Sequence, residues 1–324
     1  MHEPGFFQQL VEAELKKIPF NFSPAELYEP IRYMLSLGGK RMRPSLVMMG
    51  TELFGGDYRE ALTPALGIEV FHNFTLLHDD LMDKAPVRRS QQTVHTKWNP
   101  DIAILSGDTM FVKSCELMMQ VNDDVLRDVM NLFHHTAIEV CEGQQFDMNY
   151  ETKETISAEE YIQMISLKTA ALLAASLKTG ALVAHADEVD ANHLHEFGKK
   201  TGIAFQLHDD ILDLYGDEQK FGKQTGGDII SNKKTFLLLS ALETAKGNDL
   251  NELKRWLAMK EFNPSEKVNS VKEIFSHLNI REASEEKMDG FFQEALAAFD
   301  QVRVPREMKI PLKTFAEKLM VREV

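Results

Sequence analysis

The chain has 324 residues, and its shares of hydrophobic residues (44%) and charged residues (27%) are those of a globular protein with a large buried core. Its formal net charge of −14 at pH 7 repels polyanions, so nucleic acid is excluded as an expected partner. The sequence has only two cysteines at no paired spacing, no basic leader before an apolar run and no apolar stretch of membrane length, so we expect a cytoplasmic protein without a signal peptide or a transmembrane segment.

Helix signals recur along the chain. The segment Ser23–Glu26 has the pattern of a capping box with proline at the first helical position, and Thr63-Pro64 marks a second helix start. From Ile68 to Met82 the apolar residues recur at helical spacing. A further capping box at Ser157–Glu160 predicts a helix over Tyr161–Leu177.

Strand signals are missing from the sequence, which has no series of short β-branched runs and no hairpin turn between alternating residues. We therefore predict an all-α fold in a single domain over residues 1–324. Residues 245–324 carry no recognisable chemistry, and we expect them to complete a helical shell.

One seven-residue segment occurs twice. LHDDLMD at Leu77–Asp83 reappears as LHDDILD at Leu207–Asp213. On a helix the aspartates of each segment share one face. The sequence therefore contains two acidic clusters. One is formed by Asp79, Asp80 and Asp83, and the other by Asp209, Asp210 and Asp213.

Like charges on one helical face repel each other, so a cation should compensate them. Oxygen ligands without cysteine favour a hard ion, Mg²⁺ or Ca²⁺, and neither segment has the central glycine and terminal glutamate of an EF-hand. Two such clusters facing each other could bind Mg²⁺ ions that also hold a diphosphate. The competing hypothesis, a solvated acidic surface, does not explain a near-duplicate with apolar flanks.

Basic residues stand out against this acidic background. Gly38–Pro44 (GGKRMRP) places three cations behind two glycines, and Arg88-Arg89 follows the first acidic cluster. Lys168-Thr169, Lys223 and Lys233–Thr235 add further cations. Glycines allow close backbone approach and guanidinium groups match phosphate oxygens, so the pattern indicates an anionic ligand held by Mg²⁺ on one side and by Lys and Arg on the other.

In this order and spacing the motifs resemble those of the trans-polyprenyl diphosphate synthases, in the short-chain group that makes farnesyl and geranylgeranyl diphosphate. The resemblance covers residues 37–235, from GGKRMRP through DDLMD and FQLHDDILD to the GK, GGD and KKT elements. The sequence departs from the family at Ser90, where a glycine is usual. The resemblance implies a helical bundle around a central active-site cavity, three Mg²⁺ ions per site and a homodimer.

The resemblance also implies roles for the matching residues. The metal ligands would be Asp79, Asp80, Asp83, Asp209, Asp210 and Asp213. The allylic diphosphate would be contacted by Arg88, Lys168, Lys223 and Lys233. Isopentenyl diphosphate would be bound by Lys40, Arg43, His72 and Arg89. The residues near the reacting carbons would be Thr169 and Gln206.

The implied reaction condenses isopentenyl diphosphate with a dimethylallyl, geranyl or farnesyl diphosphate by ionisation, condensation and elimination. The all-trans product would have fifteen to twenty carbons. Product length should follow the depth of the pocket beneath Asp79, where Thr75 and Phe74 lie about one helical turn below and Phe71 is a deeper floor. The simpler alternative is that both phenylalanines only fill the core.

Three other functions compete with this one. A class I terpene cyclase would share the metal and diphosphate chemistry, but it needs no second-substrate pocket such as Lys40 and Arg43. A non-catalytic subunit of a heteromeric prenyl synthase would be expected to lose aspartates or Gln206. A plain cation-binding helical protein does not account for GGKRMRP or Lys168-Thr169.

Overall fold

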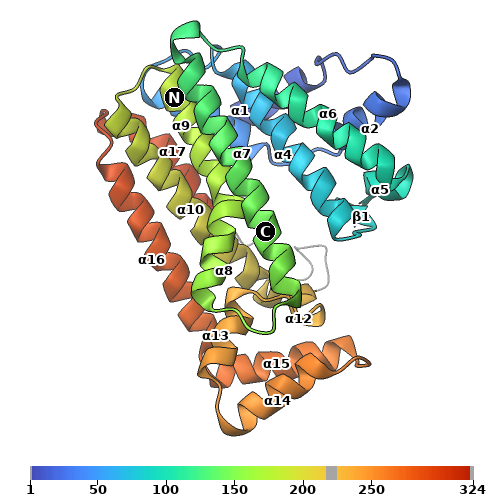
Figure 1. Cartoon of the computed structure of the whole chain (residues 1–324). Coiled ribbons are helices and arrows are strands. Elements are labelled where there is room, and N and C mark those ends of the chain that lie inside the picture. The colour runs from blue at the N-terminus through green and yellow to red at the C-terminus, as the bar shows by residue number, and fades with distance from the viewer. Residues whose placement is uncertain (1, 217–224, 322–324) are drawn as a thin grey trace. The chain divides into compact units, whose positions relative to one another are not determined.

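Helices make up almost all of the regular structure in the computed structural model, which describes residues 2–216 and 225–321 (Figure 1). This confirms the predicted all-α fold class. Within those residues the only strands form a short antiparallel hairpin of β1 (Val87–Arg88) and β2 (Gln91–Gln92). None of the described helices combines the length and the hydrophobicity that a membrane crossing requires.

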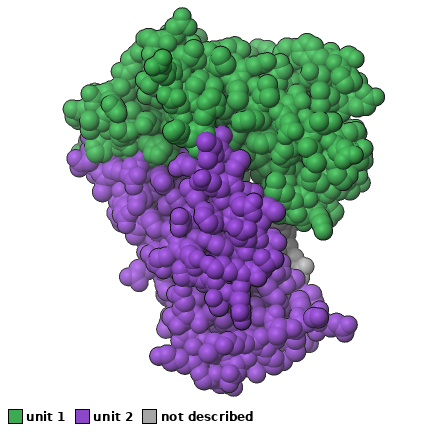
Figure 2. Space-filling view, in the orientation of Figure 1, with its two compact units in different colours: residues 1–136, 173–195, 302–312 green, residues 137–172, 196–301, 313–324 purple. Residues whose placement is uncertain are grey.

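The chain divides into two compact units, coloured separately in Figure 2. Unit 1 contains residues 1–136, 173–195 and 302–312, and unit 2 contains residues 137–172, 196–301 and 313–324. Four helices contribute to both units, namely α7 (Asp123–Thr152), α9 (Ala171–Val183), α10 (Glu188–Tyr215) and α17 (Arg306–Met320). The single-domain interpretation of residues 1–324 stays a prediction.

The remaining helices of unit 1 are α1 (Pro4–Leu15), α2 (Ala25–Ser36), α3 (Met42–Leu53), α4 (Leu62–Met82), α5 (Val94–Lys97) and α6 (Pro100–Met118). Helix α4 packs along α6 and against α3. A helix does begin close to Thr63-Pro64, but α4 starts at Leu62 and its N-cap residue is Ala61, so the expected capping by Thr63 is wrong. The capping box expected at Ser23–Glu26 is wrong: Pro24 occupies the N-cap position of α2, so the Ser23 hydroxyl comes one residue too early to cap it.

Helices α3 and α9 pack in unusually close contact within unit 1. A side chain at Gly180 would collide with the carbonyl oxygen of Val47, and one at Gly50 would lie 2.6 Å from the carbonyl oxygen of Leu177. The hydroxyl of Thr51 donates a hydrogen bond to the carbonyl of Gly180 at 3.1 Å. Glycine is therefore required on both helices for the backbones to approach this closely. Their contact fixes α3, which begins inside the GGKRMRP motif.

Unit 2 adds α8 (Ala158–Ile165), a π-helix η1 (Ser166–Ala170), α12 (Gly227–Ile230), α13 (Phe236–Thr244), α14 (Gly247–Ala258), α15 (Pro264–His277) and α16 (Ile280–Asp300). The capping box at Ser157–Glu160 is confirmed, with hydrogen bonds of 3.1 Å and 2.8 Å between the two residues. The helix predicted over Tyr161–Leu177 begins as expected. It is then interrupted by η1, and pattern reasoning gave no sign of that interruption.

Where the structure describes residues 245–324, they consist mainly of the helices α14 to α17, and one of their side chains is buried deeply. Lys267 on α15 is fully buried, and its Nζ donates to Oδ1 of Asn232 at 2.5 Å and to the carbonyl of Ile230 at 3.3 Å. It therefore anchors the turn that follows α12. That turn leads directly into Lys233.

Candidate active site

The first aspartate cluster lies at the end of helix α4. Asp80 belongs to the last turn and Asp83 is the C-cap residue. The carbonyl end of a helix carries partial negative charge, so carboxylates there are destabilised unless a cation neutralises them. Arg88 on β1 supplies one cation: its Nε lies 2.8 Å from both carboxylate oxygens of Asp80, and its terminal nitrogen lies 3.8 Å from Asp79.

The three aspartates of this cluster differ in exposure. Asp80 is only 3% exposed. Burial raises the pKa of Asp80, and the hydrogen bonds and charge of Arg88 oppose that rise. Asp79 and Asp83 are more exposed, so their carboxylates are the ones that a cation arriving from solvent can reach.

The second cluster repeats this burial pattern within unit 2, near the end of α10. Asp210 is 5% exposed, whereas Asp209 and Asp213 are partly exposed. Tyr161 donates a hydrogen bond to Oδ2 of Asp210 at 2.5 Å, and Gln206 donates one to Oδ1 at 3.0 Å. Burial raises the pKa of Asp210 to about 7. In each cluster, therefore, the middle aspartate is buried and held by neighbouring side chains.

The turn that follows the second cluster is tied to it by hydrogen bonds. The backbone N–H of Asp228, at the start of α12, donates to Oδ2 of Asp213 at 3.0 Å. The N–H of Lys233 in turn donates to the carbonyl of Asp228 at 2.8 Å, and the positive charge of Lys233 acts on Asp210. Lys233 is exposed, as expected for a ligand contact. Lys223, the other cation predicted in this region, lies outside the described residues.

The π-helix η1 carries Lys168 and Thr169. Single π turns inside helices are frequent at functional sites. Here η1 lies against α7, where a side chain at Gly143 would collide with the backbone of Lys168. The ammonium group of Lys168 lies 2.5 Å from Oδ2 of Asp147, and the hydroxyl of Thr169 donates to Oε1 of Gln206 at 3.2 Å.

Two hydrogen bonds fix the direction of the Gln206 amide. Its oxygen accepts from Thr169 and its nitrogen donates to Asp210. Tyr161 completes the series by holding the other oxygen of Asp210. The structure thus brings Thr169 and Gln206 together, and it adds Tyr161 and Asp147, for which the sequence predicted no role.

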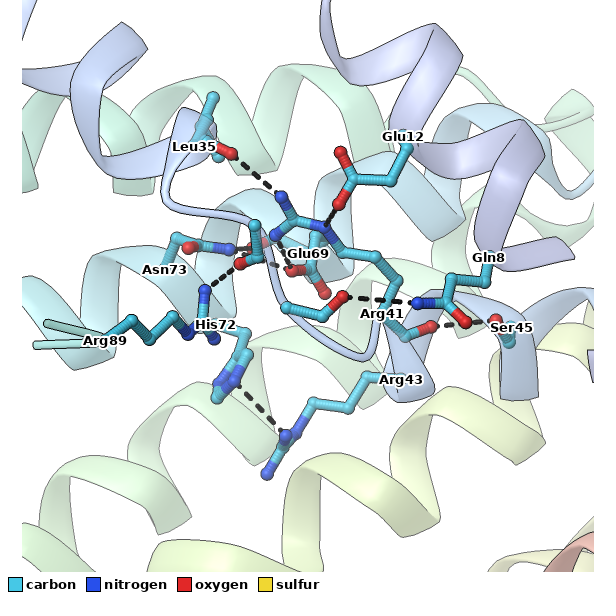
Figure 3. A network of polar contacts seen from close by, with 12 residues as sticks. Gln8, Glu12, Leu35, Arg41, Arg43, Ser45, Glu69, His72, Asn73 and Arg89 are labelled. Carbon is cyan, nitrogen blue, oxygen red and sulfur yellow. Dashed lines mark hydrogen bonds and ion pairs between the residues drawn. The ribbon is translucent and has the colours of Figure 1, made fainter. Parts of the chain in front are cut away.

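The GGKRMRP motif lies in unit 1, and Figure 3 shows its residues Arg41 and Arg43 together with His72 and Arg89. Lys40 is exposed, and Arg43 points its guanidinium at the imidazole of His72, with 3.3 Å between Nη1 and Nε2. Arg89 donates a hydrogen bond to the carbonyl of Gly38. The structure therefore gathers Arg43, His72 and Arg89, three of the four residues predicted for one anionic ligand, while Lys40 lies on the adjoining loop.

His72 stays uncharged in this basic surrounding. Burial lowers the pKa of His72 well below its usual value, and the charges of Arg43, Arg89 and Arg88 lower it further. The imidazole can therefore donate a hydrogen bond to an anion without adding positive charge.

An aromatic cluster lies beneath the first aspartates. Phe71 is 1% exposed, and its ring lies 5.5 Å from that of Phe74, 6.0 Å from that of Phe111 and 5.2 Å from that of Phe133. Phe74 also contacts Phe111 at 5.5 Å and is less buried than Phe71. Phe111 and Phe133 lie on α6 and α7, so only the packing of the helices could reveal them. Thr75 turns its hydroxyl back to the carbonyl of His72 at 2.8 Å.

The donor chemistry of the two clusters fits Mg²⁺. Among the described residues, no group of three or more His, Cys, Asp or Glu side chains is arranged to enclose a metal ion by itself. Mg²⁺ is commonly bound through one or two carboxylates while water and substrate phosphates supply the other ligands. The more exposed carboxylates fit that role, namely Asp79, Asp83, Asp209 and Asp213.

The chain matches the family described as polyprenyl synthetase over residues 24–277. A geranylgeranyl diphosphate synthase of Methanosarcina mazei is 40% identical over 222 residues, which are 68% of each chain. A geranylgeranyl diphosphate synthase of Sulfolobus acidocaldarius is 36% identical over 82% of this chain and 83% of that one. A crystal structure of a geranylgeranyl pyrophosphate synthase superposes with a TM-score of 0.94, at 39% identity over 100% of both chains.

Proposed function

Because the chain belongs to the polyprenyl synthetase family and is a prenyl diphosphate synthase, we propose that it condenses isopentenyl diphosphate with allylic diphosphates and that its main product is twenty-carbon geranylgeranyl diphosphate. The observation that carries the proposal is the burial pattern that both aspartate clusters repeat: in each, the middle aspartate is buried and the other two carboxylates are more exposed. The product length is supported by the names of the relatives and by the small Thr75 beside Phe74.

Residues of unit 1 bind isopentenyl diphosphate, some through charge and one through hydrogen bonds. Lys40, Arg43 and Arg89 supply positive charge, and Arg guanidinium groups form paired hydrogen bonds with phosphate oxygens. The neutral His72 orients the same group through hydrogen bonds. Arg89 must leave the carbonyl of Gly38 to reach a ligand, and the incoming phosphate offers a stronger acceptor than that carbonyl.

The allylic diphosphate is bound by cations and by ions held on the aspartates. Asp79, Asp83, Asp209 and Asp213 would hold Mg²⁺, with three ions expected. Bound Mg²⁺ supplies Lewis-acid stabilisation of the negative charge that develops on a departing diphosphate. Arg88, Lys168 and Lys233 add fixed positive charge for the same oxygens, and fixed charges aimed at developing charge commonly contribute most to catalysis.

The carbons that become electron-deficient meet oriented dipoles. The hydroxyl of Thr169 donates toward Gln206, so its lone pairs remain available to face positive charge. The Gln206 amide is held by Thr169 and Asp210 and does not reorganise during the reaction. The proton released in the last step passes to the departed diphosphate in this scheme.

We also propose that the enzyme is a homodimer in the cytoplasm. An apolar stripe at seven-residue spacing runs along helix α6 to its C-cap residue, and its members Leu105, Val112 and Met119 are 58%, 57% and 54% exposed. Such a stripe fits the same stripe on a second copy about a twofold axis. Both cysteines are free thiols, which suits a reducing compartment. Light scattering should give twice the mass of one chain, and a monomer would contradict the dimer.

The test of the reaction is an incubation of the purified protein with Mg²⁺, isopentenyl diphosphate and each of the three allylic starters, followed by mass spectrometry. Elongated all-trans diphosphates ending at twenty carbons support the proposal. Cyclic hydrocarbons would indicate a terpene cyclase, and no turnover of any starter would indicate a non-catalytic subunit.

A further inference from the structure

Arg41 lies in the middle of the GGKRMRP motif. Its side chain is buried, whereas Lys40 is exposed and Arg43 is partly exposed. Only 2% of Arg41 is exposed. Its Nε donates to Oε1 of Glu12 at 2.7 Å, and its two terminal nitrogens donate to Oε1 of Glu69 at 2.6 Å and to the carbonyl of Leu35 at 2.8 Å (Figure 3). The guanidinium thus joins helix α1, helix α4 and the end of α2.

The backbone of Arg41 is in the left-handed region, with φ 43° and ψ 40°. That conformation is uncommon for a residue with a side chain and persists where the surroundings enforce it. Its carbonyl accepts a hydrogen bond from the hydroxyl of Ser45 at 2.7 Å, which fixes the first turn of α3. The turn at Arg41 therefore sets where Lys40 leaves the loop and where Arg43 starts along the helix.

The same stretch of α4 serves both the buried ion pair and the binding site. Asn73 donates to Oε1 of Glu69 at 2.9 Å, which holds the carboxylate that faces Arg41. His72, the residue next to Asn73, contacts Arg43. A shift of Arg41 relative to Glu69 would therefore change the spacing between Arg43 and His72.

Arg41 remains charged in this position. Burial by itself lowers the pKa of Arg41, but the charge of Glu69 and the hydrogen bonds with Glu12 and Glu69 raise it above its ordinary value. A buried guanidinium with two carboxylate partners is fixed more firmly than an exposed one, because moving it away from both partners would leave an uncompensated buried charge.

We propose that Arg41 is a positioning residue for the isopentenyl diphosphate site and that Glu12, on the N-terminal helix α1, belongs to the same device. The inference rests on the proposed function. Glu12 and Glu69 fix the guanidinium of Arg41, and the guanidinium fixes the turn before α3. That turn sets the positions of Lys40 and Arg43 toward the ligand.

A second contact from α1 supports this assignment. Gln8, one turn before Glu12, directs its amide nitrogen at the carbonyl of Gly39 at 3.5 Å. From the other direction, the Arg89 guanidinium packs so closely on Gly39 that a side chain there would lie 2.9 Å from it. Helix α1 thus contacts the loop that carries Lys40 directly, so a change in α1 can alter the position of Lys40 without a change in any other element.

The test compares R41K and E12Q with the wild type, and R59K at an exposed arginine serves as the matched control. Lysine keeps the charge but cannot make the three directed contacts. We expect the Kd of isopentenyl diphosphate, measured by calorimetry without an allylic substrate, to rise about tenfold in R41K and about threefold in E12Q. The KM of the allylic substrate should change less than about twofold.

The double variant gives the sharper readout. If Glu12 acts through Arg41, E12Q adds little to R41K, because residues of one network are not additive. Glu12 is partly exposed, so E12Q remains informative if R41K fails to fold. Wild-type affinity in both variants, with only a lower melting temperature, would overturn the inference and leave the proposed function intact. Wild-type protein that neither binds isopentenyl diphosphate nor elongates a starter would overturn both.

Discussion

Tyr161 donates its hydroxyl hydrogen to Oδ2 of Asp210 at 2.5 Å, 49 residues away in the sequence, and both side chains are buried. The bond determines how the middle aspartate of the second cluster is oriented. Since Asp210 also accepts from Gln206, and Gln206 accepts from Thr169, one tyrosine hydroxyl stands at the end of a series of hydrogen bonds that includes both of these side chains.

Removing this hydroxyl should slow the reaction more than it weakens substrate binding. In Tyr161→Phe the Asp210 carboxylate loses a buried hydrogen bond and is free to turn away from Gln206, so we expect kcat to fall about tenfold with KM nearly unchanged. Steady-state kinetics measures both. Tyr150→Phe is the matched control, because it deletes the same hydroxyl from another buried tyrosine of unit 2. Equal kcat values for the two variants would reject the role of Tyr161.

Phe74 should limit product length. It is less buried than Phe71 and belongs to the aromatic cluster beneath Asp79. Phe74→Ala opens space in that direction, so chromatography should show the main product lengthened by at least one isoprene unit. Phe71→Ala is the poorer test, because emptying a fully buried site costs about 3–5 kcal/mol of stability. Phe22→Ala, at an exposed site, should keep the wild-type distribution, and an unchanged distribution in Phe74→Ala would reject this role.

Gly143 should tolerate no side chain. Alanine there would collide with the backbone of Lys168 in η1, so Gly143→Ala should lower both the melting temperature and the activity. Gly290, in α16, meets nothing within 4 Å of an added side-chain carbon. Gly290→Ala should therefore stabilise the protein by roughly 0.5–1 kcal/mol through the greater helix propensity of alanine. Thermal melts of the two variants should show a lower melting temperature for Gly143→Ala and a higher one for Gly290→Ala. Equal changes in melting temperature would contradict the close packing of α7 on η1.

His72 should make stability depend on pH. Its pKa is lower in the folded state than in the unfolded chain, so the unfolded chain binds more protons below about pH 6.5 and stability falls as the pH falls. The slope due to one group reaches at most about 1.4 kcal/mol per pH unit. Melting curves between pH 7 and pH 5, roughly spanning that pKa, should be flatter for His72→Gln than for the wild type. His277→Gln, at an exposed site, should follow the wild type. Parallel curves for wild type and His72→Gln would contradict this assignment.

The sequence predicted much of this molecule because its strongest signals are local. The duplicated LHDD segments and the capping box at Ser157–Glu160 depend on neighbouring residues, and both lie on helices as expected. The similar burial of Asp80 and Asp210 also follows from the repeat, since similar sequences on helices expose similar faces.

The remaining features depend on contacts between distant segments. Nothing in GGKRMRP indicates that Arg41 is buried while Arg43 faces His72. The side chain of Arg41 is buried because it pairs with Glu12 and Glu69, which lie far away in the sequence. The π turn at Ser166–Ala170 lies where α7 packs against it, and no local composition marks it. The deeper wall of Phe111 and Phe133 likewise becomes visible only once α6 and α7 lie against α4.

The most direct test of the account is the conversion of farnesyl diphosphate by the purified enzyme with isopentenyl diphosphate and Mg²⁺, read by mass spectrometry. The account predicts geranylgeranyl diphosphate as the main product, and its loss in Asp79→Asn and Asp209→Asn. Farnesyl diphosphate that remains unelongated, while geranyl diphosphate is converted to farnesyl diphosphate, would contradict the proposed product. No elongation of any starter would contradict the proposed activity.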